Sequence, residues 1–212
     1  MAAGTDPHSW ETLFRHAMEI IDAALAVAGP SLARWTFGGG TALMLTHRHR
    51  VSKDVDLFFD DPQVLSFLSP RLNGVAESKT GACDEQTNYL KLYFPEGEID
   101  FIVSCALTPS RSLEVLGRLI QIENDAEILA KKLAYRGSSM KARDILDIAC
   151  VLERSPSVAS ILRPFYSRHR DAIESRLRDR ESVLREDFVQ LDIWEYKRGF
   201  DSCVEIMRRE LA

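Results

Sequence analysis

Residues 38–59 read Gly-Gly-Gly-Thr-Ala-Leu-Met-Leu-Thr-His-Arg-His-Arg-Val-Ser-Lys-Asp-Val-Asp-Leu-Phe-Phe, and this stretch decides how the rest of the chain is interpreted. Near its end, Asp54 and Asp56 alternate with large apolar residues. Alternation of this kind indicates a strand, because successive side chains of a strand point to opposite faces. Both carboxylates are therefore expected on one face, with Val55 and Leu57 turned into a core. Neighbouring carboxylates repel each other unless a positive charge lies between them, and hard divalent cations take oxygen ligands of this type.

A glycine turn precedes the two aspartates. Gly39 and Gly40 permit close approach of the backbone to a ligand, and a helix that starts at about Thr41 would direct free N–H groups at an anion. Two common nucleotide motifs are excluded, since Leu43 stands where a Rossmann fingerprint needs its third glycine and no Gly-Lys-Ser/Thr follows for a P-loop. A phosphate-binding turn beside a magnesium-binding carboxylate pair indicates phosphoryl or nucleotidyl transfer.

The same residues resemble a known family. The run Gly39-Gly40-Thr41-Ala42-Leu43, followed by Arg50-x-Ser52-x-Asp54-x-Asp56-Leu57-Phe58, is similar to the AbiEii/AbiGii-type toxin nucleotidyltransferases of the DNA polymerase β superfamily. The resemblance extends more loosely to Asp100 and to a helical segment at residues 126–150, and the C-terminal end of the chain matches nothing.

The resemblance implies a role for each matched residue. Asp54, Asp56 and Asp100 would hold two Mg²⁺ ions, with Mn²⁺ as a substitute, and Asp100 would help to deprotonate an acceptor hydroxyl. Asp100 also stands out by itself, because it is a polar residue between Ile99 and Phe101 in an apolar strand. Phosphate or nucleotide contacts are implied for Gly39, Gly40, Thr41, Arg50, Ser52, Lys132 and Asp144.

Two basic segments allow a structural as well as a functional interpretation. For His47 and His49 a solvated loop is favoured, because a His-x-His metal site lacks partners in the sequence. Residues 163–185 are rich in arginine with interleaved acids, so pairing along a helix is the default and an RNA-binding face is the alternative.

Composition limits the class of protein. The 212 residues carry a net charge of -5, which argues against bulk coating of nucleic acid but not against a local basic patch. Four scattered cysteines form neither a zinc motif nor a redox motif. No secretory signal and no membrane-length apolar run is seen, which predicts a cytoplasmic protein without membrane contact.

The periodicities predict an α/β (α+β) fold, with an α/β half (residues 1–111) followed by a helical half (residues 112–212). The family resemblance implies that the first half is a polymerase-β-like core with a small mixed sheet and that the second half completes the active-site cleft. Within this division, helical spacing runs from about residue 112 to the end of the chain. The core is expected to contain helices at 7–28, about 41–46 and within 63–73, and strands at 35–37, 54–59, 89–94 and 99–103.

The predicted function is metal-dependent transfer of a nucleotide from an NTP to an acceptor hydroxyl. The family resemblance makes RNA, specifically the 3′ end of a tRNA, the expected acceptor and adds a toxin role with a cognate antitoxin protein. Two alternatives stay open: a small-molecule nucleotidyltransferase of the antibiotic-modifying type, and a non-catalytic relative that binds a nucleotide or a partner.

Overall fold

The computed structural model describes residues 8–29 and 34–212. The chain forms two compact units: unit 1 comprises Met1–Ala42 and Ser52–Glu123, and unit 2 comprises Leu43–Val51 and Asn124–Ala212. The expected domain boundary between residues 111 and 112 therefore falls inside unit 1. The division into a domain of residues 1–111 and a domain of residues 112–212 remains a prediction.

Unit 1 is built on one mixed sheet of seven strands, whose order is β3-β4-β5-β2-β1-β7-β6. β2 lies parallel to β5 and β1 parallel to β7, while the other neighbours are antiparallel. This mixed sheet confirms the predicted fold class. The strands are β1 (Trp35–Gly38), β2 (Val55–Phe59), β3 (Cys83–Glu85), β4 (Tyr89–Phe94), β5 (Gly97–Val103), β6 (Arg111–Val115) and β7 (Arg118–Ile122).

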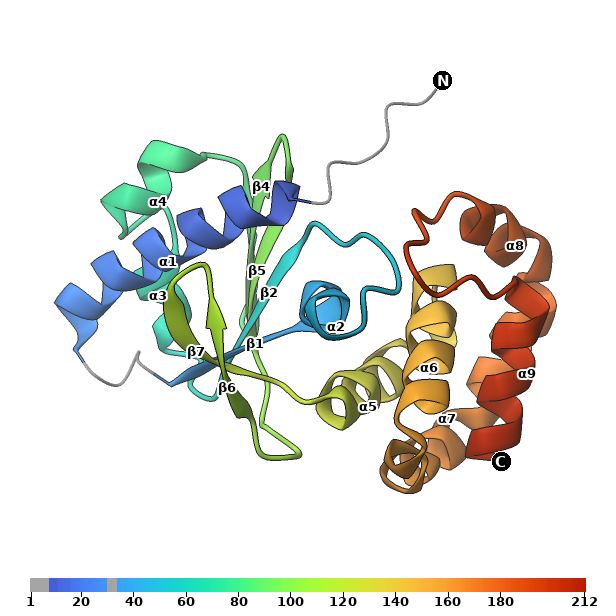
Figure 1. Ribbon diagram of the computed structural model, residues 1–212. Helices are drawn as coiled ribbons and strands as arrows, with labels where there is room; N and C mark the ends of the chain where they lie inside the picture. The colour runs from blue at the N-terminus through green and yellow to red at the C-terminus, as the bar shows by residue number, and fades with distance from the viewer. Residues whose placement is uncertain (1–7, 30–33) are drawn as a thin grey trace. The chain divides into compact units, whose positions relative to one another are not determined.

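Helices α1 (Ser9–Ala28), α3 (Val64–Leu68) and α4 (Gly74–Lys79) pack together on one face of this sheet (Figure 1). The face they cover is apolar because every second residue of β2 is buried, as the alternation in the sequence predicted. Phe37 of β1 lies in this core, with its ring centroid 6.5 Å from that of Trp10 and 5.4 Å from that of Phe14.

The helix expected at about residues 41–46 is α2 (Gly39–His47), which begins two residues earlier and passes from unit 1 into unit 2 after Ala42. The expected helix at 7–28 is confirmed as α1, although residue 7 lies outside the described residues.

The expectation of helical structure from about residue 112, with breaks near residues 137–139 and 155–156, is wrong for its first part. Residues 111–122 form the hairpin of β6 and β7, in which Val115 pairs with Arg118 across a two-residue turn. Both turn residues have positive φ, 48° at Leu116 and 80° at Gly117, which is the backbone of a tight type I′ hairpin. The leucines at 113 and 116 suit helical spacing, so the sequence concealed this turn.

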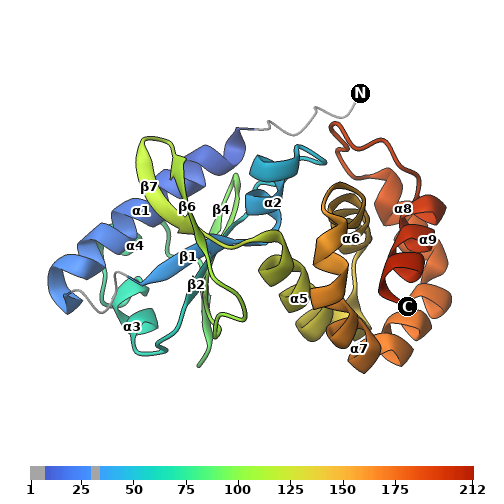
Figure 2. The ribbon, with the colours of Figure 1, turned by 60° about the horizontal axis from the view of Figure 1, so that its bottom comes forward.

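The part of unit 2 that follows Glu123 is helical. In this part α6 packs against α9, and both α5 and α9 pack against α7 (Figure 2). The segment before Ser52 joins it through a bridge between Arg50 and Ile193. No helix of the described residues has the length and apolar character that a membrane span requires. The helices are α5 (Asp125–Arg136), η2 (Gly137–Ser139), α6 (Ala142–Arg154), η3 (Pro156–Val158), α7 (Ala159–Asp179), α8 (Glu181–Val189) and α9 (Phe200–Leu211).

Candidate active site

A row of polar residues crosses the sheet of unit 1. Strand pairing places Gly38 opposite Asp56, Asp56 opposite Asp100, Asp100 opposite Lys91 and Lys91 opposite Asp84. Residues at one level of a sheet project from the same face. This face is the one opposite the apolar face of Phe37 and Leu57, because neighbours along a strand alternate. The sheet therefore brings Asp56 and Asp100 together, as predicted.

The glycine turn lies directly against the Asp56 carboxylate. Gly39 has a φ of 68°, and a Cβ atom at this position would lie 1.9 Å from Asp56 Oδ2. A side chain is therefore excluded, both by the left-handed backbone and by the carboxylate itself. Gly40 follows as the second residue of α2.

Thr41 ties the start of α2 to the strand that carries the aspartates. Its fully buried hydroxyl donates a hydrogen bond of 2.5 Å to the backbone carbonyl of Asp54. Asp54 itself precedes β2, and its Oδ1 accepts a hydrogen bond of 3.3 Å from the backbone N–H of Glu98. Ser52 is half-buried two residues earlier. The turn and the Asp-x-Asp segment thus form one connected element.

Asp100 is a perturbed carboxylate of this row. Its side chain is 19% exposed, and burial, followed by the negative charge of Asp56, raises its pKa to about 6. Asp100 Oδ1 is buried and has no hydrogen-bond partner among the described residues. Two carboxylates in mutual repulsion, one with an unused oxygen, form a site that favours a cation.

Lys91 and Glu98 were not predicted as site residues. Lys91 Nζ lies 3.0 Å from Asp100 Oδ2 and also donates a hydrogen bond to the Glu98 carboxylate. Although burial lowers the pKa of Lys91, these two carboxylates hold it above its usual value. The ammonium group therefore stays charged in the row.

Glu123, the last residue of unit 1, is another carboxylate that sequence reasoning missed. A Cβ atom on Gly38 would lie 2.3 Å from Glu123 Oε2, and the Thr36 hydroxyl lies 3.3 Å from Glu123 Oε1. The side chain is 4% exposed. An acid directly after the apolar end of a strand is a usable sequence signal, but only once β7 is recognised as a strand.

Asp56 and Asp100 together fit a divalent cation. The buried, unpartnered Oδ1 of Asp100 beside Asp56 is the observation that carries this fit. Among residues 8–29 and 34–212, no group of three or more His, Cys, Asp or Glu side chains is gathered closely enough to hold a metal ion. The expected three-ligand set of Asp54, Asp56 and Asp100 therefore stays a prediction.

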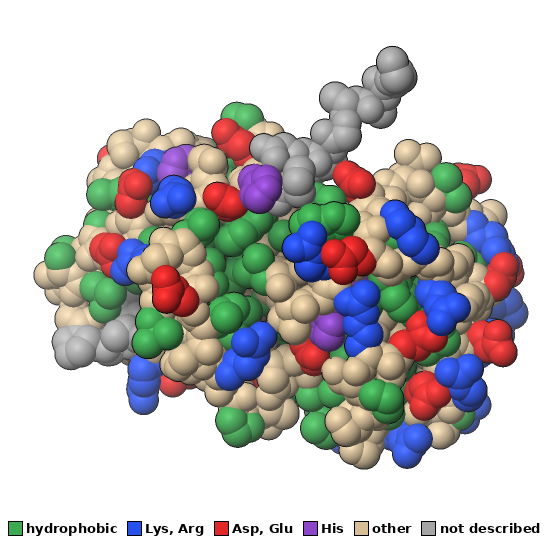
Figure 3. Space-filling view, in the orientation of Figure 1, with side chains coloured by type: hydrophobic (Ala, Val, Ile, Leu, Met, Phe, Trp, Pro, Cys, Tyr) green, Lys and Arg blue, Asp and Glu red, His purple; other side chains and the backbone are tan. Residues whose placement is uncertain are grey.

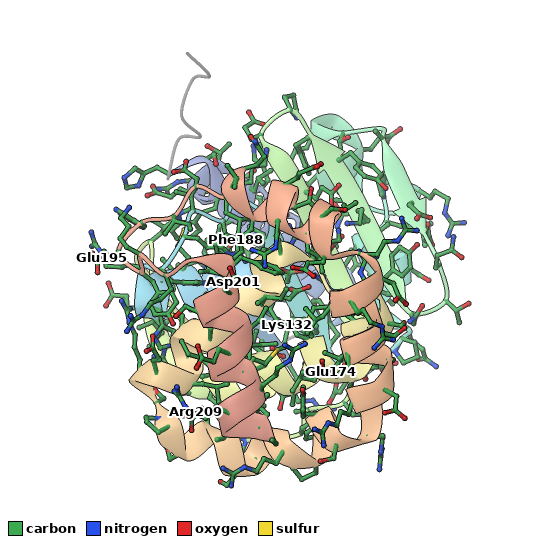
Figure 4. All side chains as sticks on the ribbon, turned by 90° about the vertical axis from the view of Figure 1, so that its right-hand side faces the viewer. Lys132, Glu174, Phe188, Glu195, Asp201 and Arg209 are labelled. Carbon is green, nitrogen blue, oxygen red and sulfur yellow. The ribbon has the colours of Figure 1, made fainter. Side chains whose placement is uncertain are left out.

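Three of the other predicted nucleotide-binding residues meet in a buried ionic cluster of unit 2. Arg50 Nε and Nη2 donate hydrogen bonds of 2.7 and 2.9 Å to the two oxygens of Asp147. Lys132 Nζ lies 2.6 Å from Asp144 Oδ1 and 3.0 Å from Asp147 Oδ2. Both acids are fully buried, and Figure 4 shows Lys132 inside the helical unit.

The acids of this cluster are stabilised in their charged form. Burial alone would raise the pKa of Asp147, but Arg50, Lys132 and His49 hold it well below its usual value. The remaining nitrogen of Arg50, Nη1, donates to the carbonyl of Val51 at 3.1 Å. A contact of Arg50 or Lys132 with phosphate would compete with these bonds, and the nucleotide-binding roles of Arg50, Ser52, Lys132 and Asp144 stay predictions.

The expectation of a solvated loop is wrong for both histidines. His49 is 1% exposed with Nε2 2.7 Å from Asp147 Oδ1, and His47 is 7% exposed with Nε2 2.9 Å from Asp125 Oδ2. The acids that hold them lie many residues away in the chain, on α5 and α6, so local composition could not reveal the contacts.

A family model matches most of the chain. The family model described as nucleotidyl transferase AbiEii toxin, Type IV TA system, matches residues 23–206. No curated protein matches the chain.

Solved structures with the same fold include a solution structure of the antibiotic-resistance factor ANT(2″)-Ia. It is 18% identical, with a TM-score of 0.51, and the alignment covers 79% of this chain and 98% of that one. The nucleotidyltransferase toxin MenT4 from Mycobacterium tuberculosis is 19% identical, with a TM-score of 0.47 and coverage of 95% and 88%. JHP933 from Helicobacter pylori is 17% identical, with a TM-score of 0.49 and coverage of 94% and 90%.

Proposed function

The chain belongs to the AbiEii nucleotidyltransferase toxin family, and from this premise we propose that it transfers a nucleotide from an NTP to a hydroxyl of RNA, specifically the 3′ end of a tRNA, in a reaction that requires a divalent metal. The observation that carries the proposal is the pairing of Asp56 with Asp100 at one level of the sheet. Gly39 lies against the Asp56 carboxylate, where a phosphate-binding turn would be needed.

In the proposed reaction the acceptor hydroxyl oxygen attacks the α-phosphorus of the NTP. The bond from the α-phosphorus to the bridging oxygen breaks, pyrophosphate leaves, and the hydroxyl proton passes to a carboxylate. Asp100 is the candidate acceptor of this proton, because its Oδ1 is buried without a hydrogen-bond partner among the described residues. Asp56 and Asp100, with Asp54 as a further ligand, would hold Mg²⁺ or Mn²⁺. When bound, this ion would neutralise negative charge on the phosphates.

The toxin role and its partner also belong to the proposal. A cognate antitoxin protein and a cytoplasmic location are supported by the family alone, whose description names a toxin–antitoxin system.

Incubation of the protein with each labelled NTP, Mg²⁺ and total RNA tests the proposal. Label is expected on RNA of tRNA size, and chelation of the metal should prevent it. Label on a panel of hydroxylated small molecules, but not on RNA, would favour the small-molecule nucleotidyltransferase. Absence of transfer with every NTP, despite NTP binding, would favour the non-catalytic relative.

Substitution of Gly39 by alanine should abolish transfer, because the new methyl group would displace the Asp56 carboxylate. Gly117→Ala is the matched control: it introduces a side chain at a φ of 80° but meets no atom within 4 Å. Rates of RNA labelling and circular dichroism spectra should be compared for the two variants. Equal rates for Gly39→Ala and the wild type would show that the turn and Asp56 are not part of one site.

Arginines of α7 provide a candidate contact surface for the RNA backbone. Arg168 and Arg170 of α7, and Arg180 directly after it, are exposed and form no ion pair within the described part of the chain, whereas Arg185 pairs with Glu181 and Asp201. Charged side chains of both signs mix over unit 2 in Figure 3, so arginines outside a close ion pair are the better candidates for phosphate contacts.

The double variant Arg168→Gln/Arg170→Gln should therefore bind bulk tRNA more weakly and with a smaller salt dependence. Each lost phosphate contact with a single strand should reduce the slope of log K against log salt by about 0.7. Arg209→Gln is the control, because Arg209 is equally exposed but pairs with Glu210. Fluorescence anisotropy at several salt concentrations measures the slope, and an unchanged slope in the double variant would exclude this surface.

A further inference from the structure

Lys91 contacts the candidate catalytic residue Asp100, but the reaction proposed above assigns it no role. It lies directly opposite Asp100 in the antiparallel pair of β4 and β5, and its Nζ is 3.0 Å from Asp100 Oδ2. The same ammonium group hydrogen-bonds to Glu98, two residues before Asp100 on the same face of β5. The Lys91 side chain is 24% exposed, so the contact is partly shielded from water.

This contact makes the two oxygens of Asp100 different. Oδ2 is occupied by the ammonium group, while Oδ1 is buried and has no hydrogen-bond partner among the described residues. The carboxylate therefore has one oxygen left for chemistry, and Asp56 is its lateral neighbour on the side away from Lys91.

We propose that Lys91 is a positioning residue for nucleotide transfer: it holds Oδ2 of Asp100 so that Oδ1 stays oriented for the proton of the acceptor hydroxyl. This inference rests on the proposed function. Lys91 touches Asp100 and Glu98, and it acts on the reaction only through Asp100.

A positioning role and a structural role predict different results. A cross-strand ion pair stabilises a sheet modestly, and if Lys91 had only this structural role, its loss would change stability without changing kcat. A positioning ammonium group adds fixed positive charge beside the carboxylates and repels a second cation. Its removal should therefore tighten binding of a divalent cation while it slows transfer, since the catalytic carboxylate is no longer oriented.

The experiment compares the full-length wild type with Lys91→Met, Lys91→Gln and Lys91→Arg. Lys79→Met is the matched control, because Lys79 is 15% exposed and its Nζ lies 2.5 Å from Glu19 on the helix-covered face of the same unit. Titration with Mn²⁺ alone, followed by electron paramagnetic resonance, gives the metal affinity. Labelling of total RNA gives kcat and the KM for the NTP.

We expect Lys91→Met to lower kcat by ~10- to 100-fold, the range expected for a misplaced catalytic group, with little change in the KM for the NTP. Its Mn²⁺ dissociation constant should fall, Lys91→Arg should recover most of kcat, and Lys79→Met should change neither quantity. Lys91→Gln keeps a polar side chain of similar length and serves if the methionine variant does not fold.

The failure of this inference can be told apart from failure of the proposed function. If the wild type binds Mn²⁺ and labels RNA, and the Lys91 variants do both equally well, only the positioning role is overturned. If the wild type neither binds Mn²⁺ nor labels any acceptor, the proposed function fails and the positioning role fails with it.

Discussion

Asp56→Asn should reduce nucleotide transfer by ~10³-fold or more, which corresponds to about 4 kcal/mol of transition-state stabilisation. The substitution keeps the size of the side chain and so preserves its packing against Gly39, but it removes the charge that faces Asp100. An amide is a weaker ligand for a hard cation than a carboxylate. The rate of RNA labelling at saturating NTP measures the effect.

Asp84→Asn is the control for the Asp56 variant. Asp84 lies at the other end of the same row, where its carboxylate accepts hydrogen bonds from Tyr89 and Gln86 instead of facing Asp100. It should retain near wild-type activity, and both variants should unfold at about the wild-type temperature. If Asp56→Asn transfers nucleotide as fast as Asp84→Asn does, the carboxylate pair is not the catalytic centre.

The sequence predicted the central part of the candidate site because its signals are local. Two aspartates at alternate positions share a face whatever their surroundings, and a glycine pair before them limits the backbone in a recognisable way. Asp100 was identifiable because it interrupts an apolar strand. Of these residues, Asp56 and Asp100 occupy adjacent positions in the sheet, and Asp56 lies opposite Gly38.

Residues whose role depends on a distant partner could not be predicted. Lys91 resembles any polar residue of an alternating strand until β4 is paired with β5, and Glu123 acquires its neighbours only when β7 lies beside β1. His49 sits in a basic segment that reads as solvated, yet its charge partner lies on α6, 98 residues away. Charge in a sequence indicates exposure only when no tertiary partner exists.

The hairpin of β6 and β7 shows the same limit for the backbone. Its turn places a leucine at positive φ, which is uncommon for a residue with a side chain. The usual Asn-Gly or Asp-Gly signal was absent, and the pairing of β7 with β1 offsets the local cost. Tertiary pairing therefore overrode the helical spacing of the leucines.

Asp147→Asn should produce the largest loss of stability, about 3–5 kcal/mol in the free energy of unfolding, because it removes the buried carboxylate that both Arg50 and Lys132 contact. Urea unfolding followed by far-UV circular dichroism and by the fluorescence of Trp194, which lies in unit 2, measures this loss.

The pH dependence provides an independent check on the same cluster. The pKa of Asp147 is lowered in the folded state, so its stabilisation is fully present above the unfolded pKa of about 3.9 and is lost as the pH falls toward the folded value. The difference in stability between the wild type and Asp147→Asn should therefore shrink below about pH 4.

Asp201→Asn is the control, because Asp201 pairs with Arg185 but is 79% exposed, and exposed pairs contribute about 1 kcal/mol or less. Equal stability of the two variants at neutral pH would mean that the Asp147 cluster does not hold residues 43–51 to the helices, and Arg50 and Lys132 would then be available for phosphate.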